Sequence, residues 1–245
     1  MKPLSAFTVF SRALAVVVTL AGAAPACLAE GPWSASLALT TDYVLRGVSQ
    51  SYGGAALQGG VNYQSSSGWF AGGWASNVDP YPFYANAGEL NLYAGYDWAL
   101  GRDWSARASV THYLYVLDPR RRPYDYDELS MTFGYQDRLA ATVSYQPNAI
   151  RYVTLGYRKN KPAMSYELTG RLPLRWNLSV TGGVGYYDLQ QLYGLGYWSG
   201  SAGISYTRGH LELGASRFFS DATVRQLFDE GTADGRWVAS AVWRF

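Results

Sequence analysis

Charged residues, histidine and cysteine are scarce in this sequence, and each scarcity narrows the class of protein. Charged residues make up 16% of the 245 residues, against about 25% in an average soluble domain. The one cysteine, Cys27, lies near the N-terminus, so no disulfide framework holds the chain together. Beyond residue 29, no apolar run approaches the roughly 18 residues that indicate a membrane-spanning helix. The sequence therefore indicates neither a disulfide scaffold nor a helical membrane protein.

Aromatic residues and glycine are abundant instead. The chain contains 21 Tyr, 9 Trp and 27 Gly, and 48% of its residues are hydrophobic. Such a hydrophobic fraction disfavours intrinsic disorder. Glycine and tyrosine also replace much of the Ala, Glu, Lys and Leu that dominates coiled coils. The composition favours a folded protein that is not a coiled coil.

The first 29 residues have the pattern of a secretory signal peptide. Lys2 and Arg12 provide a basic start, residues 13–23 form an apolar core, and the residues up to Ala29 are small and weakly polar. We expect cleavage after Ala29, which leaves residues 30–245 as one mature domain. Cleavage before Cys27, which would produce a lipoprotein, is the alternative.

The mature chain has no net charge. Lys2 and Arg12 are the only charged residues of the leader, so 18 basic residues remain against 18 acidic ones. A neutral chain lacks the basic surface that nucleic-acid binding requires, and we therefore expect no nucleic-acid partner.

Beyond the leader, hydrophobic and polar residues alternate with a period of two. Leu90 and Leu92, for example, alternate with Glu89 and Asn91. Such alternation places successive side chains on opposite faces of a sheet, one apolar and one polar. The pattern predicts twelve strands, over residues 34–46, 54–64, 69–78, 89–98, 103–116, 125–135, 139–146, 163–172, 176–187, 197–207, 211–220 and 235–245.

Short and long connections alternate between these strands, which is typical of a transmembrane β-barrel with short periplasmic turns and longer outer loops. Residues 147–162 interrupt this rhythm. A single-chain bacterial barrel with both ends in the periplasm has an even number of strands. We therefore assign 147–162 to an outer loop, which could include a strand extension beyond the membrane. A barrel of fourteen strands is the alternative.

Three features favour such a barrel over a soluble β-sandwich. Aromatic residues such as Trp98 and Trp104 flank the short turns, where an interfacial girdle is expected. The polar faces of the strands are rich in Gly, Ser, Thr and Asn. The chain also ends in an alternating apolar stripe that includes Trp243 and Phe245, resembling the assembly signal read by the barrel-assembly machinery. We predict an all-β fold, a transmembrane antiparallel up-and-down β-barrel in the outer membrane of a Gram-negative bacterium.

Three segments resemble the TorF family of proteobacterial porins. They are TDYVLRGVSQS at 41–51, GGWASNVD at 72–79 and ELNLYAGY at 89–96. The resemblance is collinear over about residues 34–245 and is weakest at 147–162. It implies an outer-membrane barrel, and it supplies no catalytic residues.

The sequence does not predict an enzyme. Outer-membrane lipases and proteases need histidine beside an acid or a serine at the outer rim. His210 falls in a predicted periplasmic turn, and His112 shares the apolar face of its strand. No metal-ligand spacing and no phosphate-binding loop is present, so we expect no cofactor and no metal.

The polar face offers the better functional hypothesis. A charge facing lipid near the membrane centre costs about 2–4 kcal/mol, so charged residues in the strands should face the lumen. We expect a porin-like channel for small polar solutes or ions, with outer-membrane lipid and lipopolysaccharide around it. A non-conducting structural or adhesive barrel is the alternative. The pore-lining candidates, in which Asp42 and Arg46 set the charge at a constriction, are Asp42, Arg46, Glu89, Asp97, Arg107, Glu128, Glu167, Arg171, Glu212 and Arg236.

Overall fold

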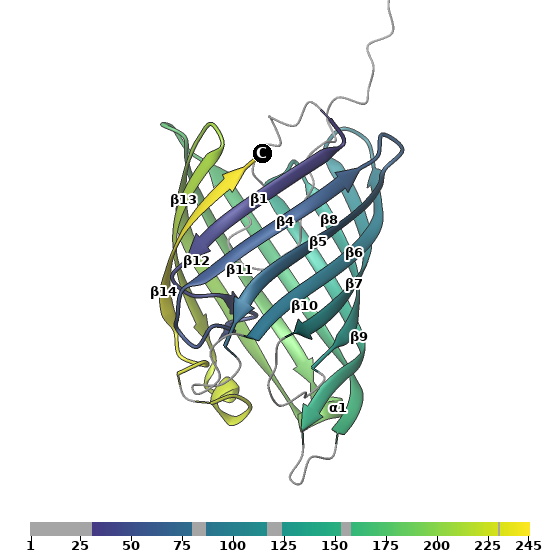
Figure 1. Cartoon of the computed structure of the whole chain (residues 1–245), viewed down its shortest axis with the longest axis vertical. Coiled ribbons are helices and arrows are strands. Elements are labelled where there is room, and N and C mark those ends of the chain that lie inside the picture. Colours follow the sequence, from purple (N-terminus) through teal and green to yellow (C-terminus); the bar gives the residue numbers. More distant parts are fainter. Residues whose placement is uncertain (1–30, 80–86, 117–123, 153–157, 230) are drawn as a thin grey trace, which may run out of the picture.

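The computed structural model describes residues 31–79, 87–116, 124–152, 158–229 and 231–245, and within them twelve antiparallel strands close into a barrel (Figure 1). Each strand pairs with its neighbour in the sequence, and the first pairs with the last to close the sheet. The predicted all-β class and the number of barrel strands are confirmed. The barrel strands are β1 (Trp33–Thr40), β4 (Ala56–Gln64), β5 (Trp69–Val78), β6 (Ala87–Ala99), β7 (Trp104–Val116), β8 (Tyr126–Tyr135), β9 (Leu139–Tyr152), β10 (Arg158–Pro173), β11 (Leu178–Leu189), β12 (Leu195–Arg208), β13 (Leu211–Ser220) and β14 (Arg236–Arg244).

Smaller elements occupy the connections. The strands β2 (Val44–Leu45) and β3 (Val48–Ser49) form a two-stranded hairpin, α1 spans Gln190–Tyr193, and a 3-10 helix, η2, spans Ala222–Gln226. Among the described residues, no helix is long and apolar enough to cross a membrane. The expected signal peptide, residues 1–29, lies outside the described part of the chain.

The barrel carries its apolar residues on the outside. Large hydrophobic side chains of every barrel strand are exposed, for example Leu37 and Leu39 of β1 and Leu168 and Leu172 of β10. Many of the alternate positions hold small or polar residues, several of which are buried, as Ser165 is in β10. This inversion of the usual soluble pattern is expected where the outer face contacts lipid instead of water.

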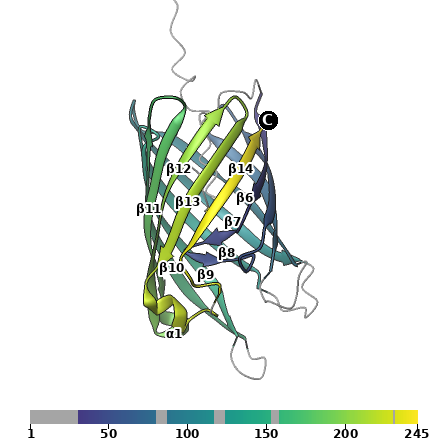
Figure 2. The same cartoon turned by 90° about the vertical axis from the view of Figure 1, so that its left-hand side faces the viewer.

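The two ends of the barrel differ. Short turns and the C-terminus lie at one end, the short-turn end, and α1 and η2 lie at the other, the long-loop end (Figures 1 and 2). Two-residue turns at Gln136–Asp137 and Trp176–Asn177 have positive φ at both positions, the geometry that matches the twist of a hairpin. Exposed tryptophans gather beside the short turns, at Trp33, Trp69, Trp98, Trp104, Trp176 and Trp243.

Strands β9 and β10 extend beyond their predicted bounds. Residues 147–152 and 158–162, assigned from the sequence to an outer loop, mostly pair as a continuation of the two strands. The register shifts between Lys161 and Ala163, on either side of Pro162. Proline has no N–H to donate to the ladder, so it occurs at edges and bulges. The assignment of 147–162 to an outer loop is corrected accordingly, and the strand extension that it allowed for is what the structure contains.

Candidate functional site

The connection from β1 to β4 folds into the barrel. β1 ends at Thr40, and residues 42–51, which we call the inward hairpin, contain β2 and β3. The hairpin, dark purple in Figures 1 and 2, lies within the outline of the barrel in both views. Arg46 and Gly47 form its turn with φ of 50° and 79°, both positive as in a type I′ turn. The predicted strand over residues 34–46 is therefore wrong beyond Thr40.

Asp42 joins the two arms of the hairpin and attaches them to the barrel wall. Its Oδ1 accepts hydrogen bonds from Ser49 Oγ at 2.6 Å and Ser51 Oγ at 2.8 Å. Its Oδ2 forms an ion pair with Nη1 of Arg236, on β14, at 2.6 Å. The Asp42 side chain is 4% exposed, and these partners satisfy a carboxylate that burial would otherwise destabilise.

Tyr43 attaches the first arm to another part of the wall. Its ring packs edge-on against Trp74 of β5 at a centroid distance of 5.4 Å. Its hydroxyl donates a hydrogen bond of 3.2 Å to Glu89 Oε1 on β6, and Asn91 donates to the same oxygen at 2.8 Å. The pore-lining candidate Glu89 is thus buried behind the hairpin, where it holds Tyr43.

Arg46, at the tip, reaches a third part of the wall. Its Nη2 donates to Glu128 Oε2, on β8, at 2.5 Å, and its Nε lies 3.5 Å from Glu167 Oε1, on β10. The guanidinium also lies over the ring of Tyr187, on β11, 4.9 Å from the centroid. Gln146 donates to Glu128 and accepts from the Tyr187 hydroxyl, which ties the wall residues to one another. The carboxylates of Glu128 and Glu167 therefore share the guanidinium of Arg46 inside the barrel.

Gly47 brings the backbone of the hairpin against β12 and β13. The Ser220 hydroxyl donates to the Gly47 carbonyl at 3.1 Å. A Cβ on Gly47 would lie 2.7 Å from Ser199 Cβ and closer still to Ser220 Oγ, nearer than real Cβ atoms approach. Only glycine fits this approach. Together with Tyr43, Arg46 and Asp42, this contact shows that the hairpin crosses the interior and touches the wall on several sides.

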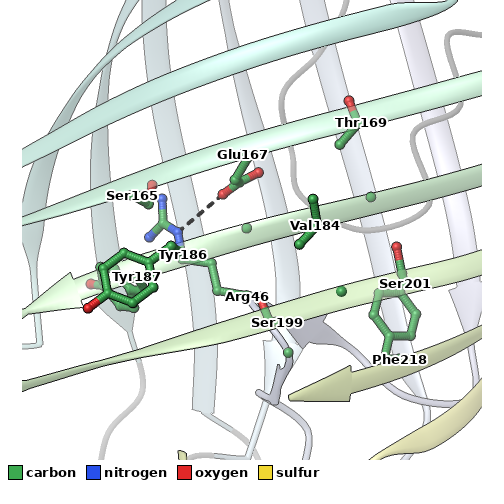
Figure 3. A pocket seen from close by; sticks show the side chains of 14 residues that line it. Arg46, Ser165, Glu167, Thr169, Val184, Tyr186, Tyr187, Ser199, Ser201 and Phe218 are labelled. Atoms are coloured by element: carbon green, nitrogen blue, oxygen red, sulfur yellow. Dashed lines mark ion pairs between the residues drawn. The ribbon is translucent and has the colours of Figure 1, made fainter. Parts of the chain in front are cut away.

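A pocket remains between the hairpin tip and the wall formed by β10 to β13 (Figure 3). Its volume is about 80 Å³. Figure 3 shows Arg46 reaching towards Glu167 on one side of this space, with the hydroxyls of Thr169 and Ser201 on the wall beside it. Small residues dominate this wall, at Ser165, Thr169, Gly183, Gly185, Ser199, Gly200 and Ser201. The wall beside the tip therefore leaves room that larger side chains would fill.

A hydrophobic cluster packs over the hairpin on the long-loop side. Val48 of the hairpin belongs to the same buried hydrophobic cluster as Leu192 of α1 and Val224 of η2. The short helices are thus part of the structure that supports the hairpin, and they are not free surface loops.

Three of the remaining candidates, Asp97, Arg107 and Glu212, form ion pairs nearer the short-turn end. Arg107 Nε lies 2.6 Å from Asp97 Oδ1, between neighbouring strands β6 and β7. Arg244 Nη1 lies 3.4 Å from Glu212 Oε2. Arg171 lies on β10, two residues from its end. The structure therefore brings Arg46, Glu128 and Glu167 together, joins Asp42 to Arg236, and does not pair Asp42 with Arg46. The role of all ten as pore-lining residues stays a prediction.

Several residues of the site were not among the sequence candidates. Tyr43, Gly47, Gln146 and Tyr187 carry no charge, and the sequence argument considered charged residues alone. The Arg46–Gly47 dipeptide between Val44-Leu45 and Val48 was the available signal, because a glycine at the second turn position favours a hairpin.

The two histidines lie apart from the hairpin. His112 Nδ1 lies 2.7 Å from Asp127 Oδ1, and both side chains are about half exposed. His210 stacks on Trp243 at the short-turn end, with centroids 5.6 Å apart. Within the described ranges, no group of three or more His, Cys, Asp or Glu side chains is arranged to hold a metal ion.

A family of bacterial proteins of unknown function, Gcw_chp, matches residues 26–241. The chain belongs to this family. No curated protein matches it in sequence. Resemblance to TorF porins specifically finds no support in this match.

Solved structures share the architecture of this Gcw_chp protein at very low sequence identity. The KdgM porin aligns with a TM-score of 0.55 at 7% identity, over 86% of this chain and 99% of its own. The NanC porin gives a TM-score of 0.55 at 8% identity, over 85% of this chain and 97% of its own. KdgM has also been solved in complex with disordered oligogalacturonate. The fold is therefore the barrel fold of outer-membrane porins.

Proposed function

We propose that this protein is an outer-membrane channel for small polar solutes or ions, with its narrowest part between the inward hairpin and the wall of β10 to β13. The observation that carries the proposal is the hairpin itself, which crosses a polar barrel interior and leaves a pocket beside Arg46. A twelve-stranded barrel lies between those of about eight strands, filled by side chains, and those of about sixteen, which hold an open channel. In such a barrel, one inserted loop suffices to set the bore.

The surface of the barrel supports placement in the outer membrane. An apolar outer face with tryptophans beside the short turns suits a lipid bilayer flanked by its interfaces. Lipopolysaccharide and outer-membrane lipid are the expected surroundings, and the barrel-assembly machinery is the expected insertion partner, through Trp243 and Phe245. The resemblance of residues 41–51 to TorF porins agrees with a porin-like role, and those residues include the whole inward hairpin.

Cysteine modification of the refolded mature protein in planar bilayers tests the proposal. The mature chain has no cysteine, so one introduced thiol is the sole target. Thr169 lines the pocket, whereas its neighbour Leu168 lies on the outer face of the same strand. We expect a charged methanethiosulfonate reagent to reduce the conductance of Thr169→Cys and to leave that of the matched control Leu168→Cys unchanged.

Two results would contradict the proposal. Absence of conductance in correctly folded wild type would favour a structural or adhesive barrel. Conductance that both thiol variants retain in full after modification would place the passage elsewhere in the barrel.

A further inference from the structure

We infer that the passage beside the inward hairpin prefers cations over anions, and that Glu167 sets this preference. The inference rests on the proposed channel function and adds the class of solute that the channel favours.

The group that Arg46 forms with Glu128 and Glu167 of the wall carries more negative than positive charge. Arg46 is approached by two carboxylates, Glu128 at 2.5 Å and Glu167 at 3.5 Å. One guanidinium neutralises one carboxylate, so the group as a whole has a formal charge of about −1 when all three residues are ionised. Because the shorter contact is to Glu128, the charge left over lies chiefly on Glu167.

The solvent exposure of the three side chains also places the excess negative charge on Glu167. The side chains of Arg46 and Glu128 are 6% and 4% exposed, whereas that of Glu167 is 18% exposed. The arginine and its closer partner therefore cover each other, and the carboxylate of Glu167 is the charged group that an entering solute meets. Low-dielectric walls concentrate the field of such a charge in a narrow passage.

The neutral residues of the pocket also suit a cation. Ser165, Thr169, Ser199 and Ser201 place hydroxyl groups around the same space as Glu167. Ser165 is 2% exposed, and its Oγ has no hydrogen-bond partner among the described residues. Carboxylate and hydroxyl oxygens are hard ligands that can replace part of the hydration shell of a small cation.

The other arginines of the barrel interior do not cancel this charge. Arg107 and Arg236 each pair with a carboxylate of their own, at 2.6 Å in both cases. Arg171 lies on the strand of Glu167, four residues away. At ~3.4 Å per residue this separation is about 14 Å, longer than the screening length of about 10 Å at 0.1 M salt.

Reversal potentials in a KCl gradient across a planar bilayer test the inference. We expect wild type to show a K⁺ to Cl⁻ permeability ratio above one. Replacing Glu167 by Gln keeps the volume and removes the charge, so the reversal potential should shift towards zero. Thr169→Asp adds a carboxylate to the same wall and should shift it the opposite way. Asp137→Asn, in an exposed turn whose positive φ suits asparagine, is the matched control and should change nothing.

The outcomes separate this inference from the proposed function. A channel that conducts but prefers anions, or whose preference Glu167→Gln and Thr169→Asp both leave unchanged, would overturn the inference and leave the channel intact. A folded wild type that does not conduct would overturn the channel, and the inference with it.

Discussion

Asp42 shows how one carboxylate can hold an inserted loop in place. It accepts from two serines of the hairpin and pairs with Arg236 of the wall, while almost completely buried. The alternation along residues 34–46 placed Asp42 on the polar face of its strand, but it could not predict which residues Asp42 contacts. Arg236 lies 194 residues away in the chain, and only closure of the barrel between β1 and β14 brings the two together.

Replacing Asp42 by Asn should loosen the inward hairpin. The amide keeps the size of the carboxylate and loses its charge, which leaves Arg236 without its ionic partner. Removing one member of a buried pair costs about 3–5 kcal/mol, and we expect hydrogen exchange of the amides in residues 42–51 to accelerate accordingly.

The exposed pair of Asp234 with Arg225 provides the control for that experiment. Its N···O distance is 3.2 Å, but its side chains are 53% and 62% exposed. Solvent screening limits such a pair to less than about 1 kcal/mol, so Asp234→Asn should leave exchange in the hairpin unchanged. Equal effects of the two substitutions would contradict the anchoring role of Asp42.

At the scale of elements, the inward hairpin depends on its turn. Gly47 has a positive φ, and its backbone packs against the side chains of Ser199 and Ser220. Gly209, in a short turn, also has a positive φ but has nothing within 4 Å of a Cβ. The two glycines share a backbone conformation and differ in their surroundings.

We therefore expect Gly47→Ala to destabilise the protein more than Gly209→Ala. Each substitution carries the cost of a left-handed non-glycine residue, about 1–2 kcal/mol. Gly47→Ala adds a steric clash with the wall. Urea unfolding followed by tryptophan fluorescence measures the difference, and equal midpoints for the two variants would show that the hairpin does not press against β12 and β13.

The period-two pattern predicted most barrel strands and failed at two connections for identifiable reasons. Along residues 34–46 the alternation continues through β1 and β2 without a Gly or Pro between them, so the turn at Thr41–Asp42 left no mark. At Pro162 the opposite occurred, because a proline and a bulge interrupt a ladder that in fact continues. The alternation of hydrophobic and polar residues indicates which face of the sheet a residue occupies. It does not indicate where the strand leaves the sheet.

At the scale of the whole molecule, the barrel was predictable because it depends on many repeated local signals. Alternation, short turns and flanking tryptophans recur in strand after strand, and an error in one leaves the others intact. The site lacked such repetition. The group of Arg46, Glu128 and Glu167 joins three segments whose relation is set by the path of one hairpin, so their charges were visible in the sequence and their meeting was not.

Removing the inward hairpin tests most directly whether it sets the narrowest part of a channel. Thr40 and Ala56 are paired across β1 and β4, so an Asn-Gly turn can join them in place of residues 41–55 and leave the barrel strands intact. The measurement is the single-channel conductance of this variant and of wild type in the same bilayer and salt. We expect a several-fold higher conductance in the shortened variant. An equal or lower conductance in a correctly folded barrel would contradict the account.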